Sequence, residues 1–267
     1  MPTRDSAWPQ GTPCWVDCSV DDPAAAREFY SRLLGWEVLD GPPEAGGYLM
    51  AMLNGRAAAG IGPKMGDGPM PSVWTTYFAA DDVDAVAAAV SAAGGTVYAP
   101  PFDVMDVGRM CVAADTDGAV FGVWQAKAHT GAEICDEPGA YCWNELHTNR
   151  FAQAKQFYLS VFGWSYHTVS DTDRFRYATF STPGSAAEVG GLMDSTTMPG
   201  ETPSYWLAWF QTADADTSLA TARELGANVL MGPEDSAFGR MGIVQGPQGE
   251  VFGLIDTTRT VGDTPTN

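Results

Sequence analysis

Residues 143–158 have the sequence WNELHTNRFAQAKQFY, and residues 15–30 have the related sequence WVDCSVDDPAAAREFY, 128 residues earlier. Each copy begins with Trp, carries an acid two residues later and reaches Phe-Tyr at the same distance. A second shared phrase follows each copy, LLGW at 33–36 and VFGW at 161–164. The alternating start and the helical continuation predict a strand that leads into a helix. The chain is therefore a duplication, and functional residues should lie at matching positions of the two halves.

The length and composition agree with two folded halves. The chain has 267 residues, of which 45% are hydrophobic and 18% are charged, enough apolar residues for a sizeable core in each half. We expect one domain at residues 11–128 and a second at residues 139–258, joined by a short connection.

The charge excludes several classes of partner. The formal net charge is −19, whereas a protein that binds nucleic acid needs a basic surface. The same charge disfavours docking to anionic membranes, and no apolar stretch of 18 residues occurs. The five cysteines are an odd number without a C-x-x-C pair, which indicates neither a disulfide framework nor a zinc knuckle. We expect a cytoplasmic protein that binds neither nucleic acid nor membranes.

One order of elements recurs four times along the chain. Strands are predicted to begin near residues 13, 73, 141 and 205, and each is followed by a helix and three further strands. Asp21-Asp22-Pro23 and Asp81-Asp82 are typical helix starts, and Gly35, Gly94 and Gly226 are typical stops. The predicted fold is therefore α+β, with four βαβββ modules.

This arrangement resembles the vicinal oxygen chelate superfamily, which includes glyoxalases, bleomycin-resistance proteins and extradiol dioxygenases. The phrases that carry the resemblance are Phe-Tyr followed by LLGW, DDVDA at 81–85 and DTDGAVFG at 115–122. The phrases GTPCWVD (11–17), PPFDV (100–104), GRM (108–110) and NEL (144–146) resemble the two-domain actinobacterial subgroup called hydroxylase or glyoxalase-like. The resemblance implies that the modules pair into two domains, each a curved mixed sheet that forms a cup with its helices outside.

The superfamily's metal ligands come from four strand positions in each cup. Counted from the shared phrases, these positions are Trp15, Gly60, Thr75, Gly122 in the first half and Trp143, Gly191, Leu207, Gly253 in the second. A divalent cation needs several converging oxygen or nitrogen donors, and only one of these eight side chains offers one. We expect no metal and no other cofactor. The four glycines either leave room for a ligand at the cup floor or permit tight packing.

Strand alternation predicts which side chains line the cups, because residues i, i+2 and i+4 share a face. The predicted lining of the first cup is Trp15, Asp17, Tyr77 and Trp124. The predicted lining of the second cup is Trp143, Glu145, His147 and Trp209. Aromatic walls with a few polar groups are typical of small-molecule pockets, and they equally suit ordinary core filling. Glu145 and His147 form the only acid–base pair on one face, so they are the candidate catalytic residues, with a structural role as the alternative.

Three functions remain open from the sequence. The first is metal-independent binding of a small hydrophobic or aromatic molecule, as in natural-product resistance. The second is an enzyme of secondary metabolism, such as a hydroxylase accessory, isomerase or lyase, that uses Glu145 and His147 for proton transfer. The third is a metal-dependent glyoxalase or dioxygenase. The sequence fits either a monomer or a homodimer.

Overall fold

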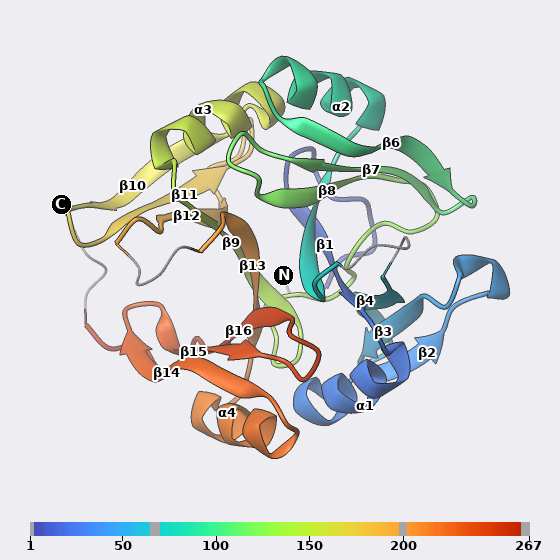
Figure 1. The fold of residues 1–267 in the computed structure, drawn as a ribbon, viewed down its shortest axis with the longest axis vertical. Helices are drawn as coiled ribbons and strands as arrows, with labels where there is room; N and C mark the ends of the chain where they lie inside the picture. The colour runs from blue at the N-terminus through green and yellow to red at the C-terminus, as the bar shows by residue number, and fades with distance from the viewer. Residues whose placement is uncertain (1–2, 65–69, 198–201, 263–267) are drawn as a thin grey trace.

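The fold is α+β, as the sequence predicts, with four βαβββ modules that form two eight-stranded mixed sheets (Figure 1). The computed structural model describes residues 3–64, 70–197 and 202–262. The sequence also predicts a linker rich in Gly, Pro and Met at residues 63–71, of which residues 65–69 lie outside these ranges. Four helices lie at the periphery of the described part of the chain, α1 beside α4 and α2 beside α3.

The first half contains β1 (Pro13–Val20), α1 (Pro23–Leu34), β2 (Glu37–Asp40), β3 (Leu49–Leu53), β4 (Arg56–Pro63), β5 (Val73–Ala79), α2 (Val83–Ala92), β6 (Thr96–Val104), β7 (Gly108–Ala114) and β8 (Val120–Ala126). A single 3-10 turn, η1 (Pro43–Ala45), precedes β3. The second half contains β9 (Tyr141–Thr148), α3 (Phe151–Phe162), β10 (Ser165–Asp171), β11 (Arg176–Ser181), β12 (Glu188–Asp194), β13 (Tyr205–Gln211), α4 (Ala215–Glu224), β14 (Asn228–Ser236), β15 (Gly239–Gln245) and β16 (Val251–Asp256).

Local signals set the helix ends. The Asp22 carboxylate accepts hydrogen bonds from the backbone N–H groups of Ala24 and Ala25 and so caps α1. Gly35 ends the same helix with φ of 74°, a left-handed conformation that costs glycine little. The sequence predicts a strand at residues 96–99, which is too short, because β6 continues to Val104 through Pro100 and Pro101. The two prolines are tolerated because β6 is an edge strand and its pairing with β7 is interrupted between Ala99 and Phe102.

The first strand of each module lies at the centre of its sheet. The strand order is β2-β3-β4-β1-β5-β8-β7-β6 in one sheet and β10-β11-β12-β9-β13-β16-β15-β14 in the other. The central pairs β1–β5 and β9–β13 are antiparallel and join two modules into one curved sheet. This pairing places Trp15 opposite Tyr77, and Trp143 opposite Trp209.

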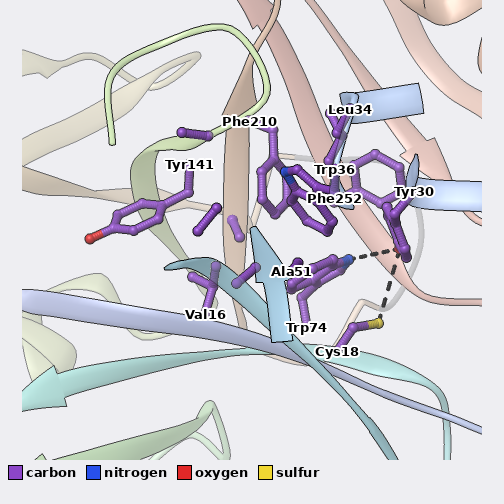
Figure 2. Close-up of a cluster of buried hydrophobic side chains, with 14 of the residues drawn as sticks. Val16, Cys18, Tyr30, Leu34, Trp36, Ala51, Trp74, Tyr141, Phe210 and Phe252 are labelled. Carbon is purple, nitrogen blue, oxygen red and sulfur yellow. Dashed lines mark hydrogen bonds between the residues drawn. The ribbon is translucent and has the colours of Figure 1, made fainter. Parts of the chain in front are cut away.

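The hydrophobic core is shared between the two halves. Trp74 of β5 packs against Phe210 of β13 at 4.9 Å between ring centroids, and Phe78 packs against Trp206 at 5.0 Å. Figure 2 shows the cluster around the first of these pairs, Trp74 and Phe210, with Tyr30 from α1 at its side. The concave faces of the two sheets therefore point away from the shared core. The domain limits 11–128 and 139–258 stay a prediction.

The tyrosine of each Phe-Tyr pair connects the halves by hydrogen bonds. The Tyr30 hydroxyl donates to Glu250 of the second half at 3.0 Å and accepts from the Trp74 indole N–H at 3.0 Å. The equivalent Tyr158 donates to Asp115 of the first half at 3.2 Å and accepts from an indole N–H at 2.9 Å. These residues explain why the phrase recurs, because each copy fixes one half against the other.

Candidate functional site

The structure brings the four predicted residues of the second cup together. Trp143, Glu145, His147 and Trp209 all line one cavity of about 720 Å³. The alternation of β9 places the first three on the concave face, and β13 supplies Trp209 beside them. A cavity of this size lies within the range of small-molecule sites.

Glu145 and His147 are in direct contact at the cavity wall. Nε2 of His147 lies 2.8 Å from Oε1 of Glu145, and both residues are buried. The imidazole stacks on Tyr205 with 4.8 Å between ring centroids. Its second nitrogen, Nδ1, is buried and has no hydrogen-bond partner among the described residues. The pair is therefore fixed in orientation and retains one unused polar atom.

Several wall residues were not predicted from the sequence. Tyr177 of β11 accepts a hydrogen bond from the Trp143 indole N–H at 3.0 Å. Burial and the neighbouring Glu145 carboxylate raise the pKa of the Tyr177 phenol well above its usual value. Phe175 stacks on Tyr177, and the Phe238 ring lies 6.0 Å from the Tyr177 ring between centroids. The remaining lining includes three flexible methionines and several polar residues, Met193, Met231, Met241, Asp136, Glu188 and Gln211.

The first cup has the same design, and its own side chains pack together in it. The Asp17 carboxylate accepts hydrogen bonds from Tyr77 at 3.0 Å and from Tyr48 at 3.3 Å. Trp15 donates its indole N–H to the Tyr48 hydroxyl at 2.9 Å. Burial raises the pKa of Asp17 to about 7, and the hydrogen bonds from the two tyrosines oppose this rise. The predicted residues of this cup are therefore assembled, and the polar groups of Trp15, Asp17 and Tyr77 are paired within the cup, whereas Nε2 of the nearby His129 is buried without a partner among the described residues.

The connection between the halves contributes to the first cup. The His129 ring lies 4.5 Å from the Trp15 ring and 5.4 Å from the Trp124 ring. The Trp124 indole N–H donates to the backbone oxygen of His129 at 2.9 Å. Burial lowers the pKa of the His129 imidazole to about 4. A neutral imidazole thus occupies space between the tryptophans of the first cup.

One substitution accounts for much of the difference between the cups. Trp124 of β8 corresponds to Ile255 of β16, because each pairs with the methionine of a GRM phrase. The Trp124 ring lies so close over Gly108 that a Cβ there would be 2.1 Å from it. Ile255 is smaller and lines the 720 Å³ cavity. A smaller cavity of about 190 Å³ lies beside Trp124 and Cys14.

The protein's own aromatic side chains pack against the four glycines at the metal-ligand positions. A Cβ at Gly60 would lie 1.7 Å from the Tyr48 hydroxyl, and one at Gly191 would lie 2.0 Å from the Tyr177 hydroxyl. The corresponding atoms at Gly122 and Gly253 would meet the rings of Tyr77 and Trp209 at 2.0 and 2.1 Å. Of the two roles considered for these glycines, the structure therefore shows tight packing.

The eight positions do not fit a metal ion in the manner of the superfamily. Glycine and tryptophan side chains supply no ligand for a divalent cation, and Leu207 is apolar. Within residues 3–64, 70–197 and 202–262, no group of three or more His, Cys, Asp or Glu side chains gathers in a way that could hold a metal. Metal independence itself stays a prediction. Among the same residues, no helix is both long and apolar enough to cross a membrane.

Comparisons with known proteins agree with this architecture. The sequence profile of the Glyoxalase/Bleomycin resistance protein/Dioxygenase superfamily matches residues 15–123 and 140–254. CFP32 of Mycobacterium tuberculosis is named as a proposed glyoxylase. Its sequence is 41% identical to this one, and the match covers 96% of this chain and 98% of CFP32. The anthracycline biosynthesis protein DauV of a Streptomyces species is 33% identical over 92% of this chain and 93% of its own.

Solved structures show the same fold at low sequence identity. The Mn(II)-bound glyoxalase of Novosphingobium aromaticivorans superposes with a TM-score of 0.62 at 19% identity, covering 97% of this chain and 86% of that one. The 2,2',3-trihydroxybiphenyl 1,2-dioxygenase of Sphingomonas wittichii superposes with a TM-score of 0.62 at 16% identity, and the superposition covers 92% of this chain and 90% of that one. With both halves matched by the profile and four βαβββ modules in the structure, the chain belongs to the glyoxalase/bleomycin resistance protein/dioxygenase superfamily.

Proposed function

We propose that the second cup binds a planar aromatic small molecule without a metal ion. The observation that carries the proposal is the 720 Å³ cavity, whose wall combines Trp143, Trp209 and Tyr177 with the polar pair Glu145 and His147. Aromatic rings favour planar ligands, and a few fixed polar groups orient them. The name of the relative DauV, an anthracycline biosynthesis protein, is compatible with a ligand from natural-product chemistry.

The two cups have different roles in this proposal. In the first cup, Tyr48 and Tyr77 satisfy Asp17, and the His129 ring packs against both tryptophans. A ligand would have to displace these contacts to enter. In the second cup Ile255 leaves a large cavity where the first has Trp124. We therefore assign binding to the second cup, and the first cup stabilises the fold.

An Ile255→Trp variant tests the assignment, because it gives the second cup the residue of the first. The new ring has a position available over Gly239, which corresponds to Gly108 under Trp124. Binding of neutral planar compounds, such as anthracenylmethanol, is measured by the anisotropy of their own fluorescence. We expect wild-type binding and at least tenfold weaker binding by the variant.

Two further variants keep this test decisive. Leu159→Trp adds the same side chain on the exposed surface of α3, where Leu159 is 45% exposed, and should bind like wild type. Thr257→Trp blocks the cavity from an exposed lining position if the Ile255 variant does not fold. Equal binding by wild type and both cavity variants, or no binding by wild type, would contradict the proposal.

A second candidate function is proton transfer on the bound molecule by Glu145 and His147. The observation that favours it is the 2.8 Å contact within the cavity wall together with the unused Nδ1 of His147. A carboxylate–imidazole pair next to a bound carbonyl compound can remove a proton from an acidic C–H bond. Hydrogen–deuterium exchange of aromatic ketones in D₂O, followed by NMR, measures this directly. Glu145→Gln should abolish catalysed exchange, whereas Glu188→Gln at the same cavity should retain it; equal rates in both would remove the assignment.

A further inference from the structure

The Asp, Glu, Lys and Arg side chains that line the second cup are all acidic. Asp136, Glu145 and Glu188 contribute three carboxyl groups to the cavity, and Glu188 lies 2.9 Å from Nδ1 of His167. None of the described lysines and arginines lines it. An anionic ligand would therefore meet like charges here, whereas a cation would meet opposite ones.

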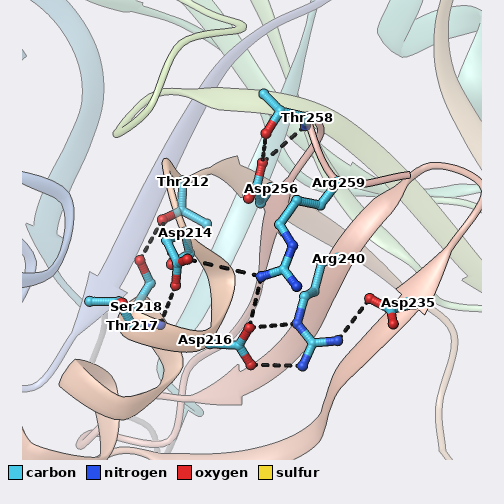
Figure 3. A network of polar contacts seen from close by, with 10 residues as sticks. All are labelled: Thr212, Asp214, Asp216, Thr217, Ser218, Asp235, Arg240, Asp256, Thr258 and Arg259. Carbon is cyan, nitrogen blue, oxygen red and sulfur yellow. Dashed lines mark hydrogen bonds and ion pairs between the residues drawn. The ribbon is translucent and has the colours of Figure 1, made fainter. Parts of the chain in front are cut away.

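Two arginines that lie close to cavity residues in the sequence, Arg240 and Arg259, are directed away from the cavity. Met241 lines the cavity, and its neighbour Arg240 lies on the other face of β15 because side chains alternate along a strand. Arg240 donates to Asp216 at 2.6 and 2.7 Å and to Asp235 at 2.7 Å (Figure 3). Arg259 also donates to Asp216, at 3.0 Å. Because these guanidinium groups are paired with α4 and β14, they do not offset the acidity of the cavity.

The uncharged polar groups of the wall offer few free donors. The Ser236 hydroxyl already donates to the backbone oxygen of Gly239 at 2.8 Å. The Thr179 hydroxyl donates to the backbone oxygen of His167 at 3.5 Å. The Trp143 indole N–H is used by the Tyr177 hydroxyl. Apart from the Gln211 amide and the Thr257 hydroxyl, the wall therefore mainly presents hydrogen-bond acceptors to a ligand.

His147 adds an acceptor that no protein group satisfies. We assign the Nε2 proton to the bond with Glu145, and in this tautomer Nδ1 is the acceptor nitrogen. This nitrogen is buried without a partner. A buried acceptor without a partner is costly, so a ligand that donates a hydrogen bond there would recover stability.

We infer that the ligand of the second cup is a planar aromatic compound that carries a protonated amine. This inference rests on the proposed function and specifies the ligand's chemical class. The aromatic part packs on Trp143, Trp209 and Phe175, whose ring faces also attract a cation. The ammonium group donates hydrogen bonds to the carboxylate and imidazole acceptors of the wall.

Three anthracene compounds of nearly equal shape test the charge preference. They are anthracenylmethylammonium, anthracenylmethanol and anthracene-9-carboxylate, which carry positive, zero and negative charge. Probe anisotropy at neutral pH should show the cation bound at least tenfold more tightly than the alcohol, and the carboxylate more weakly than the alcohol. Glu145→Gln should reduce the ratio of the affinity for the cation to the affinity for the alcohol at least fivefold.

Two controls separate the cavity from the acidic surface of the whole protein. Attraction to the surface is screened by salt. The tighter binding of the cation than of the alcohol should therefore persist at high ionic strength only if the ammonium lies within the cavity. Ile255→Trp should weaken all three probes, whereas Asp17→Asn, the corresponding acid of the first cup, should change none. Equal binding of the three compounds, or tighter binding of the carboxylate, would overturn this inference alone. Binding of none of them would contradict the proposed function as well.

Discussion

The carboxyl group of Asp17 should make the stability of the protein fall as the pH rises from weakly acidic to weakly basic. It is buried in the first cup, where Tyr77 and Tyr48 donate to it, and no cationic side chain of the described residues lowers its pKa. Burial raises its pKa from 3.8 to about 7. Replacement by Asn keeps acceptance from the two tyrosines and removes the titration.

The sign and size of the effect follow from proton linkage. The native carboxyl keeps its proton up to about pH 7, whereas the unfolded carboxyl releases its proton near 3.8. Between these values the native state binds more protons, so the stabilisation is complete below the unfolded pKa and is lost as the pH rises. One pKa unit corresponds to about 1.4 kcal/mol, so the total loss is on the order of 4 kcal/mol, of which about 2.5 kcal/mol falls between pH 5 and pH 8.

Urea unfolding of wild type and Asp17→Asn across this pH range measures the effect. The difference between the free energies of unfolding of the variant and of wild type should rise by about 2.5 kcal/mol in favour of the variant between pH 5 and pH 8. Asp106→Asn removes an exposed carboxylate and controls for the high net charge of the protein. A difference between Asp17→Asn and wild type that does not change with pH would refute the view of the first cup as a closed, dry interior.

Two further predictions concern packing and the bridge between the halves. Gly253→Ala should lower the free energy of unfolding by about 1–3 kcal/mol, because the new Cβ would lie 2.1 Å from the Trp209 ring. In a Trp209→Leu background most of this loss should disappear. Equal losses in both backgrounds, measured by urea unfolding, would show that the ring is not the obstacle. Tyr158→Phe should lower the free energy of unfolding by about 2–4 kcal/mol, since it removes a hydrogen bond to Asp115 and leaves the Trp206 N–H without its acceptor. A loss below about 1 kcal/mol would contradict the shared core, and so would separate unfolding transitions for the two halves of the wild-type protein.

The modular order could be predicted because its signals are local. Asp22 and Gly35 determine the ends of α1 through contacts within a few residues. Asp82 and Asp214 cap α2 and α4 in the same way, whereas α3 begins without a side-chain cap. The alternation along β9 was also sufficient to place Glu145 and His147 on the concave face. Register within one strand requires no knowledge of the rest of the chain.

The filling of the cups could not be predicted, because it depends on residues from separate strands. Tyr48 and Tyr177 were missed although each lies over a glycine that had been singled out. Their occurrence at nearly the same distance after the two Phe-Tyr pairs is a signal that an alignment of the halves could have found. His129 entered the first cup from the connection, which has no matching strand position. The bond between Tyr30 and Glu250 joins residues of different halves, so no local pattern indicates it.

The central claim is that the second cup holds the ligand while the first is closed by its own side chains. A crystal structure of the protein saturated with anthracenylmethylammonium tests it most directly. The account predicts one bound molecule per chain, stacked between Trp143 and Trp209 with its ammonium beside Glu145 and His147. A molecule bound between Trp15 and Trp124 with His129 displaced, or bound outside both cups, would contradict it.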